Sequence, residues 1–418
     1  MLYRCVTKIS IQQITTSYTG KKRDKLLLFD FVSSFTANNN WEDLTNKATI
    51  TVPKNISIRD KEGKLFPLGG VNQSIGGFDK ETPLFLRGDA VTINFGYIYP
   101  DKLGNDFLDL PKQPIFTGYI SKVISKNPIE LECEDNMWKL KQLPAEGGTN
   151  GLFRASQYTW ENVLRELMKT TPFTVNALTK TNIGDFRLES YETVAQVIER
   201  VRKDYHLEAY FRGNELRTGS KVYIDSEAVE STFKFQQNII SDDLEYSRKD
   251  DVVLSAICYS VNKFELTGTT KRGRKKTTSK RLEILVYTDR KGTFKYIEKT
   301  KDKSFPENVQ GERRTFYFNN VKSVTDLFNK GVDQLKKYYY TGFKGKFTTF
   351  AIPFIKLGDN VNLLDDKLPE RNGRYKVKGV EYTYMGGTDG YRQIIELDYL
   401  IFQLDAKGRI IPSEQNAK

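Results

Sequence analysis

The sequence predicts a mainly β protein with an α+β insert, built from two β-barrels in one chain and a small α/β region. Residues 347–400 alternate short apolar runs with Gly, Asp and Asn breaks, a pattern typical of antiparallel strands joined by turns. Residues 85–134 follow the same order. In both stretches a Gly-Asp turn, at Gly88 or Gly358, leads into a Val-x-Ile or Val-x-Leu strand, and a later Ile-x-Leu type strand closes the unit. Because the spacings differ, the two stretches share a structural pattern rather than a sequence repeat. The shared pattern predicts two related barrels.

We expect five segments along the chain. A length of 418 residues is enough for two to four domains that each bury a core, and the 23 Tyr and 26 Phe residues favour strands and contact surfaces. The segments are a first β-barrel (1–145), a small α/β domain (146–230), strands with a basic hairpin insertion (231–310), a helix with the second barrel (311–405) and a flexible tail (406–418).

Three amphipathic helices are expected. Residues 160–168 carry apolar side chains at i, i+3, i+4, i+7 and i+8 after the candidate N-cap Thr159, and a second such stripe follows the candidate cap Ser190. The third helix spans residues 319–340, with Ser323 as its N-cap and an acidic capping-box partner three residues on. No Gly-rich phosphate loop opens either of the first two helices, so the sequence does not indicate a nucleotide cofactor.

The residue types that enzymes and metal sites use are scarce. His206 is the only histidine, so a metal site or triad that needs a second histidine is excluded, and we interpret it as structural. The cysteines Cys5, Cys133 and Cys258 lie far apart, and each is expected in a strand core rather than in a zinc site or disulfide. Nucleophile-elbow, zincin and Cys-x-x-Cys motifs are absent. We therefore expect no catalytic site, no metal, no cofactor and no small-molecule substrate.

Adjacent carboxylates are expected at surface turns, where neighbouring side chains point to opposite sides and do not form an acid–base pair. No apolar run approaches the roughly 20 residues that a membrane helix needs. The first residues are too polar for a secretory signal, so we expect a soluble protein made in the cytoplasm. The carboxylate pairs are Asp242–Asp243, Asp250–Asp251 and Asp365–Asp366.

A basic stretch accounts for much of the net charge of +12. Residues 267–281 lie between two expected strands, so we predict a long hairpin with a basic tip. The simplest interpretation is a solvated or subunit-contacting tip. The alternative is a nucleic-acid or membrane patch, although the run contains no aromatic residue for base stacking. Residues 57–82 are expected to form a long exposed loop. The candidate contacts for a polyanion or another subunit are Lys271, Arg272, Arg274, Lys275, Lys276, Lys280 and Arg281.

The order of these elements resembles a known family. Four stretches of sequence carry the resemblance: Phe-Thr-Gly-Tyr-Ile at 116–120, Thr-Thr-Phe-Ala-Ile-Pro-Phe-Ile-Lys-Leu-Gly-Asp-Asn-Val at 348–361, Gly-Arg-Tyr-Lys-Val-Lys-Gly-Val at 373–380 and Gly-Tyr-Arg-Gln-Ile-Ile-Glu-Leu at 390–397. They are similar to the baseplate hub proteins of contractile phage tails, the late control D and T4 hub type, which are also found in related injection systems. The resemblance covers most of residues 1–404 in layout.

The resemblance implies a homotrimer in which two tube-type barrels per subunit form a pseudo-six-fold ring. Such a ring would adapt the six-fold tail tube to a three-fold spike, so the implied partners are other copies of the chain, the tail tube protein, the central spike protein and other baseplate proteins. The implied location is the tail baseplate of a virion or an injection particle, assembled in the bacterial cytoplasm. The alternatives are a basic OB-like nucleic-acid-binding protein and a tail-associated cell-wall hydrolase.

Overall fold

The structure is a computed structural model, and it describes most of the chain between residues 4 and 411. At 56–60, 65–68, 220, 261–269, 275–280, 312, 317 and 319 it describes the backbone alone. The described residues are 4–14, 16, 20, 22–53, 56–60, 62–63, 65–68, 84–100, 104–124, 128–154, 156–178, 183, 185–205, 207–220, 230–248, 254–269, 275–289, 293–299, 305–306, 312–319, 321, 323–336, 339, 341–386 and 390–411.

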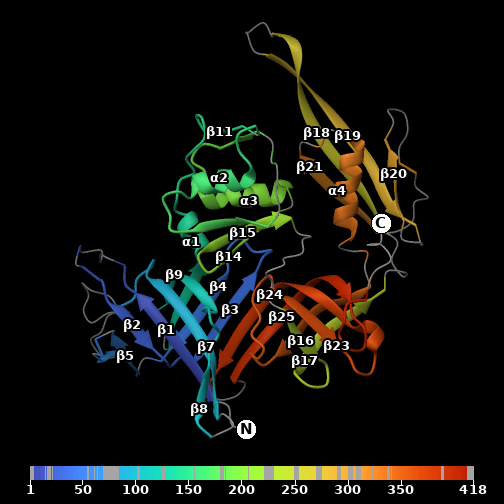
Figure 1. Cartoon of the computed structure of the whole chain (residues 1–418). Helices are drawn as coiled ribbons and strands as arrows, with labels where there is room; N and C mark the ends of the chain where they lie inside the picture. Colours follow the sequence, from blue (N-terminus) through green and yellow to red (C-terminus); the bar gives the residue numbers. More distant parts are fainter. Residues whose placement is uncertain are drawn as a thin grey trace.

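One continuous sheet of 16 strands forms the lower part of the molecule in Figure 1. Its path runs β17-β22-β25-β24-β3-β4-β10-β9-β7-β1-β2-β5-β6, with β16, β23 and β8 paired beside it. The mainly β fold class predicted from the sequence is confirmed. The first half of the sheet contains β1 (Arg4–Gln12), β2 (Leu26–Phe29), β3 (Ser34–Asn40), β4 (Lys47–Val52), β5 (Ile56–Asp60), β6 (Leu65–Leu68), β7 (Ala90–Pro100), β8 (Asp106–Asp109), β9 (Phe116–Ile124) and β10 (Ile129–Asp135). The second half contains β16 (Glu230–Lys234), β17 (Ile239–Ser247), β22 (Gly342–Thr349), β23 (Asn360–Leu364), β24 (Gly373–Met385) and β25 (Gly390–Gln403).

The strand β24 joins the two halves. Its residues 373–376 pair with β23, whereas its residues 379–385 pair with residues 34–40 of β3. On its other edge β24 pairs with β25. The two halves therefore share one hydrogen-bonded sheet and one apolar core, and in this they differ from two separately closed barrels. The strands β16 and β17, which the sequence analysis assigns to the segment 231–310, belong to the second half.

The two halves repeat the same turn, which we call the Gly-Asp corner. Gly88 and Gly358 have φ values of +94° and +82°, a conformation that glycine adopts without strain. The amide of Gly88 donates to the carbonyl of Ile120 at 2.7 Å, and that of Gly358 donates to the carbonyl of Val377 at 3.2 Å. The strands that follow, β7 and β23, pair with β9 and β24 in matching register. The structural pattern that the sequence predicts to be shared by the two stretches is confirmed at this corner.

A small α/β region lies between β10 and β16 in the chain. A three-stranded sheet, in the order β12-β15-β14, packs with α2 and α3 around an apolar core of its own. Its elements are α1 (Met137–Leu140), β11 (Leu152–Phe153), α2 (Trp160–Leu167), β12 (Thr174–Ala177), β13 (Phe186–Arg187), α3 (Val194–Tyr205), β14 (Leu207–Arg212) and β15 (Glu215–Ser220).

The helices α2 and α3 both begin after a threonine cap. The Oγ1 of Thr159 accepts a hydrogen bond from the Asn162 amide at 3.3 Å, which confirms the predicted cap of α2. At α3 the Thr193 Oγ1 accepts from the Gln196 amide at 3.3 Å, and the Gln196 Oε1 accepts from the Thr193 amide at 2.8 Å. This is a capping box, so the predicted cap Ser190 is wrong. Thr193 directly precedes α3, so its side chain can accept a hydrogen bond from a backbone amide in the first turn of the helix.

A four-stranded sheet in the order β20-β19-β18-β21 packs with α4 around a third core. The strands β18 and β19 pair as the predicted long hairpin, which projects from the molecule in Figure 1. The Ser323 Oγ accepts from the Asp326 amide at 3.0 Å, as predicted, but the helix is shorter than 319–340 because residue 319 ends β21. The elements are β18 (Leu254–Thr269), β19 (Lys275–Thr288), β20 (Phe294–Glu298), β21 (Glu312–Asn319) and α4 (Val324–Lys336).

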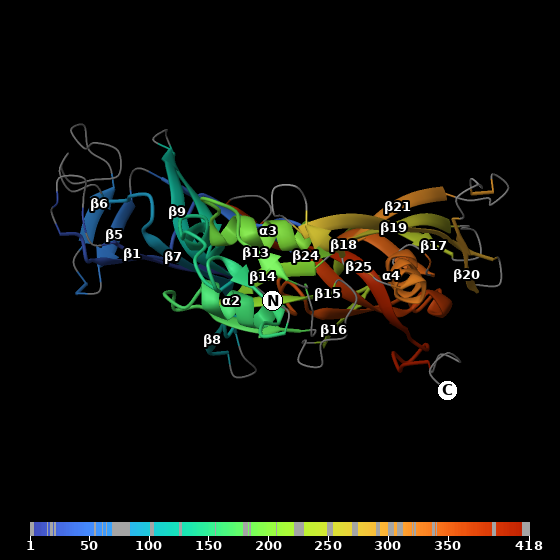
Figure 2. The ribbon, with the colours of Figure 1, turned by 90° about the horizontal axis from the view of Figure 1, so that it is seen from above.

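The α/β region and the β18–β21 sheet stand side by side above the 16-stranded sheet in Figure 1. Figure 2, seen from above, shows α2 and α3 over the middle of the molecule and α4 toward the end where the second half lies. Among the described residues, no helix is long and apolar enough to span a bilayer.

Two of the carboxylate pairs, part of the expected loop at 57–82 and the cysteines can be compared with the structure. Residues 242–243 lie at exposed positions within β17, so the predicted turn is wrong for this carboxylate pair, whereas residues 365–366 follow the end of β23 as expected. Residues 56–68 contain the β5–β6 hairpin rather than the start of a long loop, because their apolar runs pair with each other. Residues 69–83, His206 and Asp250–Asp251 lie outside the described residues. Cys133 and Cys258 are buried on strands as expected, and Cys5 is half-buried.

Candidate functional site

The basic residues singled out in the sequence belong to the β18–β19 hairpin. Arg281 is the one whose side chain is described, and its guanidinium lies 4.1 Å from the centre of the Tyr259 ring and 3.3 Å from Glu283. Its charge is therefore partly balanced within the hairpin itself. Lys275, Lys276 and Lys280 lie on β19, and Lys271, Arg272 and Arg274 lie outside the described residues.

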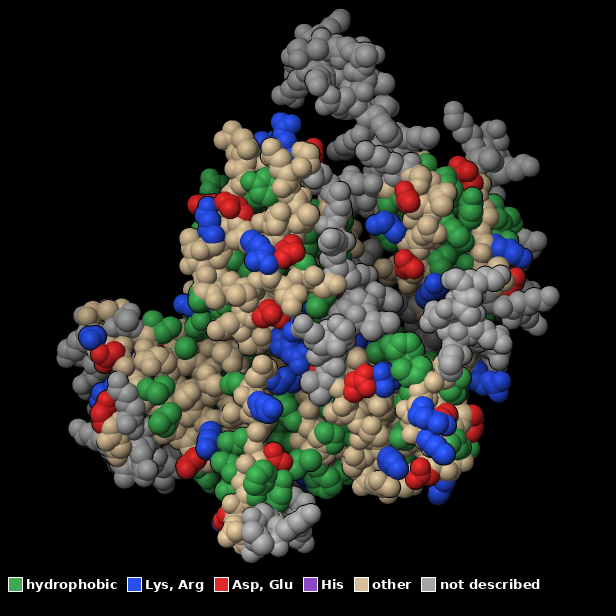
Figure 3. Space-filling model, in the orientation of Figure 1, with side chains coloured by type: hydrophobic (Ala, Val, Ile, Leu, Met, Phe, Trp, Pro, Cys, Tyr) green, Lys and Arg blue, Asp and Glu red, His purple; other side chains and the backbone are tan. Residues whose placement is uncertain are grey.

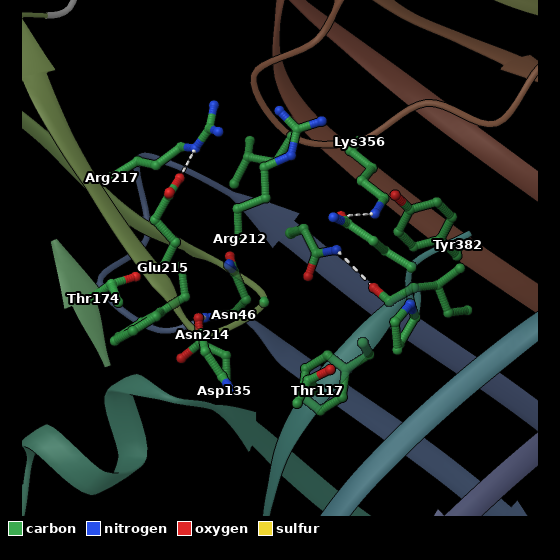
Figure 4. Close-up of a pocket in the computed structure, with 18 residues that line it drawn as sticks. Asn46, Thr117, Asp135, Thr174, Arg212, Asn214, Glu215, Arg217, Lys356 and Tyr382 are labelled. Carbon is green, nitrogen blue, oxygen red and sulfur yellow. Dashed lines mark hydrogen bonds and ion pairs between the residues drawn. The ribbon is translucent and has the colours of Figure 1, made fainter. Parts of the chain in front are cut away.

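A cavity of about 530 Å³ lies where the first half of the sheet, the α/β region and the second half meet. We call it the junction cavity. The first half contributes Asn46 and Gln113, the α/β region contributes Arg212 and Arg217, and the second half contributes Lys356 (Figure 4). Figure 3 shows Lys and Arg side chains gathered at the centre of this face, below the α/β region. The cavity thus brings together polar groups from parts of the chain that are far apart in sequence.

A small apolar cluster connects the same three parts. It consists of Trp41 from the first half, Tyr210 from the α/β region and Leu357 from the second half. The ring centroids of Trp41 and Tyr210 are 6.1 Å apart. A Cβ added at Gly358 would lie 2.5 Å from the Tyr210 hydroxyl, so the α/β region packs directly against the second Gly-Asp corner. Only glycine leaves room for this approach.

Each Gly-Asp corner pairs its buried carboxylate with an arginine. Asp89 lies 2.7 Å from Arg23, which belongs to the same half of the sheet, whereas Asp359 lies 2.8 Å from Arg212 of the α/β region. In both corners the carboxylate also accepts a hydrogen bond from the backbone amide three residues earlier, at 2.8 and 2.9 Å. The first corner is therefore complete within its own half, and the second corner is completed by the α/β region.

Lys356 begins the second corner and extends its ammonium toward the junction cavity, where Nζ donates to Gln113 Oε1 at 2.5 Å (Figure 4). Burial, followed by repulsion from Arg212, lowers the pKa of Lys356 to about 8, while Asp359 acts in the opposite direction. Among the described residues, no carboxylate lies within ion-pair distance of this ammonium. Lys356 is thus a cation with an amide oxygen as its hydrogen-bond partner.

Asp135 lies at the end of β10, on the wall of the cavity. Its carboxylate accepts hydrogen bonds from the amides of Asn46 at 3.2 Å and Met137 at 3.0 Å. Burial raises the pKa of Asp135 to about 7, and the two amide hydrogen bonds oppose this shift. Farther along the wall Glu215 pairs with Arg217 at 2.6 Å. The cavity therefore contains cations and anions whose charges are mostly matched in pairs.

The chemistry of these groups suits binding of a polar ligand. Among the described residues, those that line the cavity supply amide, guanidinium, ammonium, carboxylate and hydroxyl groups as hydrogen-bond partners. Sequence reasoning missed this site because its lining residues come from three separate parts of the chain. The available signal was the turn at Gly358–Asp359, which places Lys356 two residues before its glycine.

A second surface lies at the lower end of Figure 1, where β8 projects away from the α/β region. There the hydroxyl of Tyr97 donates to the carbonyl of Tyr391 at 3.1 Å and joins the two halves. Phe107, which packs on Tyr99, and Phe350 are each 49% exposed. Figure 3 shows hydrophobic side chains at this end of the molecule. This end of the molecule therefore presents partly exposed aromatic side chains near the contact between the two halves.

Two solved structures share this fold over nearly the whole chain. A tail protein from Neisseria meningitidis is similar with a TM-score of 0.53 and 13% identity, covering 94% of this chain and 96% of that one. The 43 kDa tail protein of prophage MuSo2 from Shewanella oneidensis is similar with a TM-score of 0.52 and 10% identity, covering 97% of this chain and 100% of that one. No family profile matches the sequence, and no curated protein matches it. At these identities the likeness is one of fold, so the chain has the fold of these two tail proteins.

Proposed function

We propose that this chain is a structural subunit of a phage tail or a related injection machine, specifically a baseplate hub. Three copies would close into a ring that contains six similar units, two from the sheet of each chain. The observation that carries the proposal is the repeated Gly-Asp corner, with matching strand register, in the two halves of one continuous sheet. The fold shared with two tail proteins supports the same conclusion.

The symmetry argument starts from two equivalent units in each chain. Heterologous contacts between identical subunits generate closed rings when the rotation closes. Three copies then present six similar units, which match a six-fold tube on one face, and three copies of every other feature, which match a three-fold spike on the opposite face. We propose the tail tube protein, the central spike protein and other baseplate proteins as the corresponding partners.

We assign two surfaces to assembly: the edge strand β17, and the surface at the β8 end that exposes Phe107 and Phe350. Among the described strands β17 pairs on one side only, with β22, and it ends the path of the sheet. Its exposed Asp242 and Asp243 disfavour unselective edge pairing, while Ile240 is 43% exposed on the same strand. The basic β18–β19 hairpin is a further contact that we assign to a neighbouring subunit or a polyanion. The role is non-enzymatic, because it resides in extended surfaces, and its place is the tail baseplate.

Light scattering followed by electron microscopy of the purified chain tests the ring. We expect a mass near three times 48.2 kDa and particles with a central opening. Ile240→Glu adds a charge to the β17 edge and should shift the mass toward the monomer. The matched control is Tyr191→Glu, because Tyr191 is fully exposed in the α/β region and its change should leave the mass unaltered. A stable dimer or tetramer, or particles without an opening, would contradict the proposal.

A further inference from the structure

We propose that the junction cavity is a binding site for a carboxylate group, with Lys356 as its charged anchor. The lining comes from the first half of the sheet, the α/β region and the second half of the sheet, so the site can be tested on the purified chain. A volume of about 530 Å³ lies within the range of pockets that hold small ligands or a few peptide side chains. The site therefore fits a small carboxylic acid or an acidic peptide segment.

The charges of the cavity leave one cation for an incoming anion. Arg212 is paired with Asp359 at 2.8 Å and Arg217 with Glu215 at 2.6 Å, so the two guanidinium groups already have carboxylate partners. The ammonium of Lys356 donates to the Gln113 amide oxygen, which carries no charge. A carboxylate that replaced or joined this amide would form the charge-assisted hydrogen bond that Lys356 lacks among the described residues.

The second observation that supports a carboxylate site is that the environment of Lys356 makes its protonated, charged form less favourable than it is in water. Burial and the neighbouring Arg212 both disfavour its protonated form, and its pKa falls to about 8. A bound carboxylate would offset that cost, so binding should raise the pKa of Lys356 and take up a proton near pH 8. The lining also contains neutral donors, including Asn214 and Thr117, that would orient a carboxylate oxygen.

Among the other titratable groups at or beside the cavity, Asp135 acts in the same direction as Lys356. Asp135, whose pKa is raised to about 7 by burial, becomes negative as the pH rises and then repels an anion. The hydroxyl of Tyr382 donates to the Ile355 carbonyl, and burial raises its pKa far above neutrality, so it stays neutral. The carboxylates Glu215 and Asp359 are held in their arginine pairs. Carboxylate affinity should therefore be highest between about pH 5 and 7, where the carboxyl groups of the ligand are ionised, and fall as the pH rises through 8.

Isothermal titration calorimetry of the full chain with tetraglutamate, tetraglutamine and succinate tests the site. We expect tetraglutamate to bind at pH 6.5 and tetraglutamine not to bind. Lys356→Gln should weaken tetraglutamate binding about tenfold or more, the usual effect of losing a charged hydrogen bond. The control is Lys378→Gln, because Lys378 is a partly exposed lysine outside the cavity that already pairs with Glu396 at 3.0 Å. Succinate that binds as well as the peptide would support the carboxylate site and identify a small acid as sufficient.

A second variant keeps the test independent of folding defects. Gln113 is exposed, so Gln113→Glu should fold normally and place a carboxylate beside Lys356. This internal partner should block tetraglutamate binding and remove the proton uptake near pH 8. The proposal is overturned if wild type binds neither acid, if tetraglutamine binds equally well, or if both cavity variants retain wild-type affinity.

Discussion

The guanidinium of Arg212 lies 2.8 Å from the carboxylate of Asp359, and this pair connects the α/β region to the second half of the sheet. In the first half the equivalent carboxylate, Asp89, is paired at 2.7 Å with Arg23 of the same half. The same corner is thus completed locally in one copy and by a distant part of the chain in the other. The second corner therefore couples the stability of the sheet to the presence of the α/β region.

Arg212→Met should lower the free energy of unfolding by about 3 kcal/mol, the effect of removing one partner from a buried ion pair. The reason is that the Asp359 side chain is only 2% exposed and would lose its cation. Urea denaturation followed by circular dichroism measures the change. The control is Arg165→Met, because Arg165 pairs with Glu161 at the surface, with 57% of the arginine side chain exposed. Such pairs contribute under about 1 kcal/mol, so equal losses in the two variants would contradict this account.

Gly358→Ala should destabilise the protein for two reasons. A non-glycine residue at positive φ costs about 1 kcal/mol, and a Cβ 2.5 Å from the Tyr210 hydroxyl adds a steric cost of roughly 1–3 kcal/mol. Gly213→Ala isolates the first cost, because Gly213 has φ of +63° with no heavy atom near an added Cβ. Thermal unfolding compares the two. Adding Tyr210→Phe to Gly358→Ala should recover part of the loss, and no recovery would show that the hydroxyl is not the obstacle.

The stability of the protein should rise with pH between about 8 and 10.5 through Lys356. Its pKa is about 8 in the folded protein and 10.5 ordinarily, so in this window the unfolded chain holds a proton that the folded protein has released. The free energy of unfolding then increases with pH. The measurement is the difference between wild type and Lys356→Gln in urea denaturation at pH 7.5, 9 and 10.5. A difference that is constant over these three pH values would contradict the lowered pKa.

Thr193→Ala should lower the free energy of unfolding by about 1 kcal/mol, because the start of α3 loses its capping side chain. Ser190→Ala is the matched control and should have almost no effect, since the helix begins after Thr193. Equal effects of the two substitutions, measured by urea denaturation, would contradict the assignment of Thr193 as the cap.

The elements that the sequence predicts well are those set by neighbouring residues. The Gly-Asp corners, the caps Thr159 and Ser323 and the long β18–β19 hairpin all depend on local backbone preferences, and the structure contains each of them. The cap of α3 was wrong because Ser190 and Thr193 have similar chemistry, and the choice between them depends on where the helix packs. Local sequence signals therefore predict that such an element exists more securely than they predict the residues at which it begins and ends.

The features that the sequence does not reveal depend on distant residues meeting in space. Nothing in the residues around Gly379 indicates that β24 leaves β23 and continues along β3. The junction cavity has the same origin, because Lys356, Gln113 and Arg212 come from three parts of the chain. Only the tertiary arrangement gives Lys356 its burial and its cationic neighbour, so its altered acidity has no counterpart in the local sequence.

The continuity of β24 has a mechanical consequence. Pulling the two halves apart along this strand would load the row of backbone hydrogen bonds from residues 379–385 to residues 34–40 in shear, so that all of them resist together. A flexible linker would let the halves rotate freely, whereas a shared strand makes them one stiff element. A displacement applied to one half is therefore carried to the other through the backbone itself, without relying on side-chain contacts that could slide or repack.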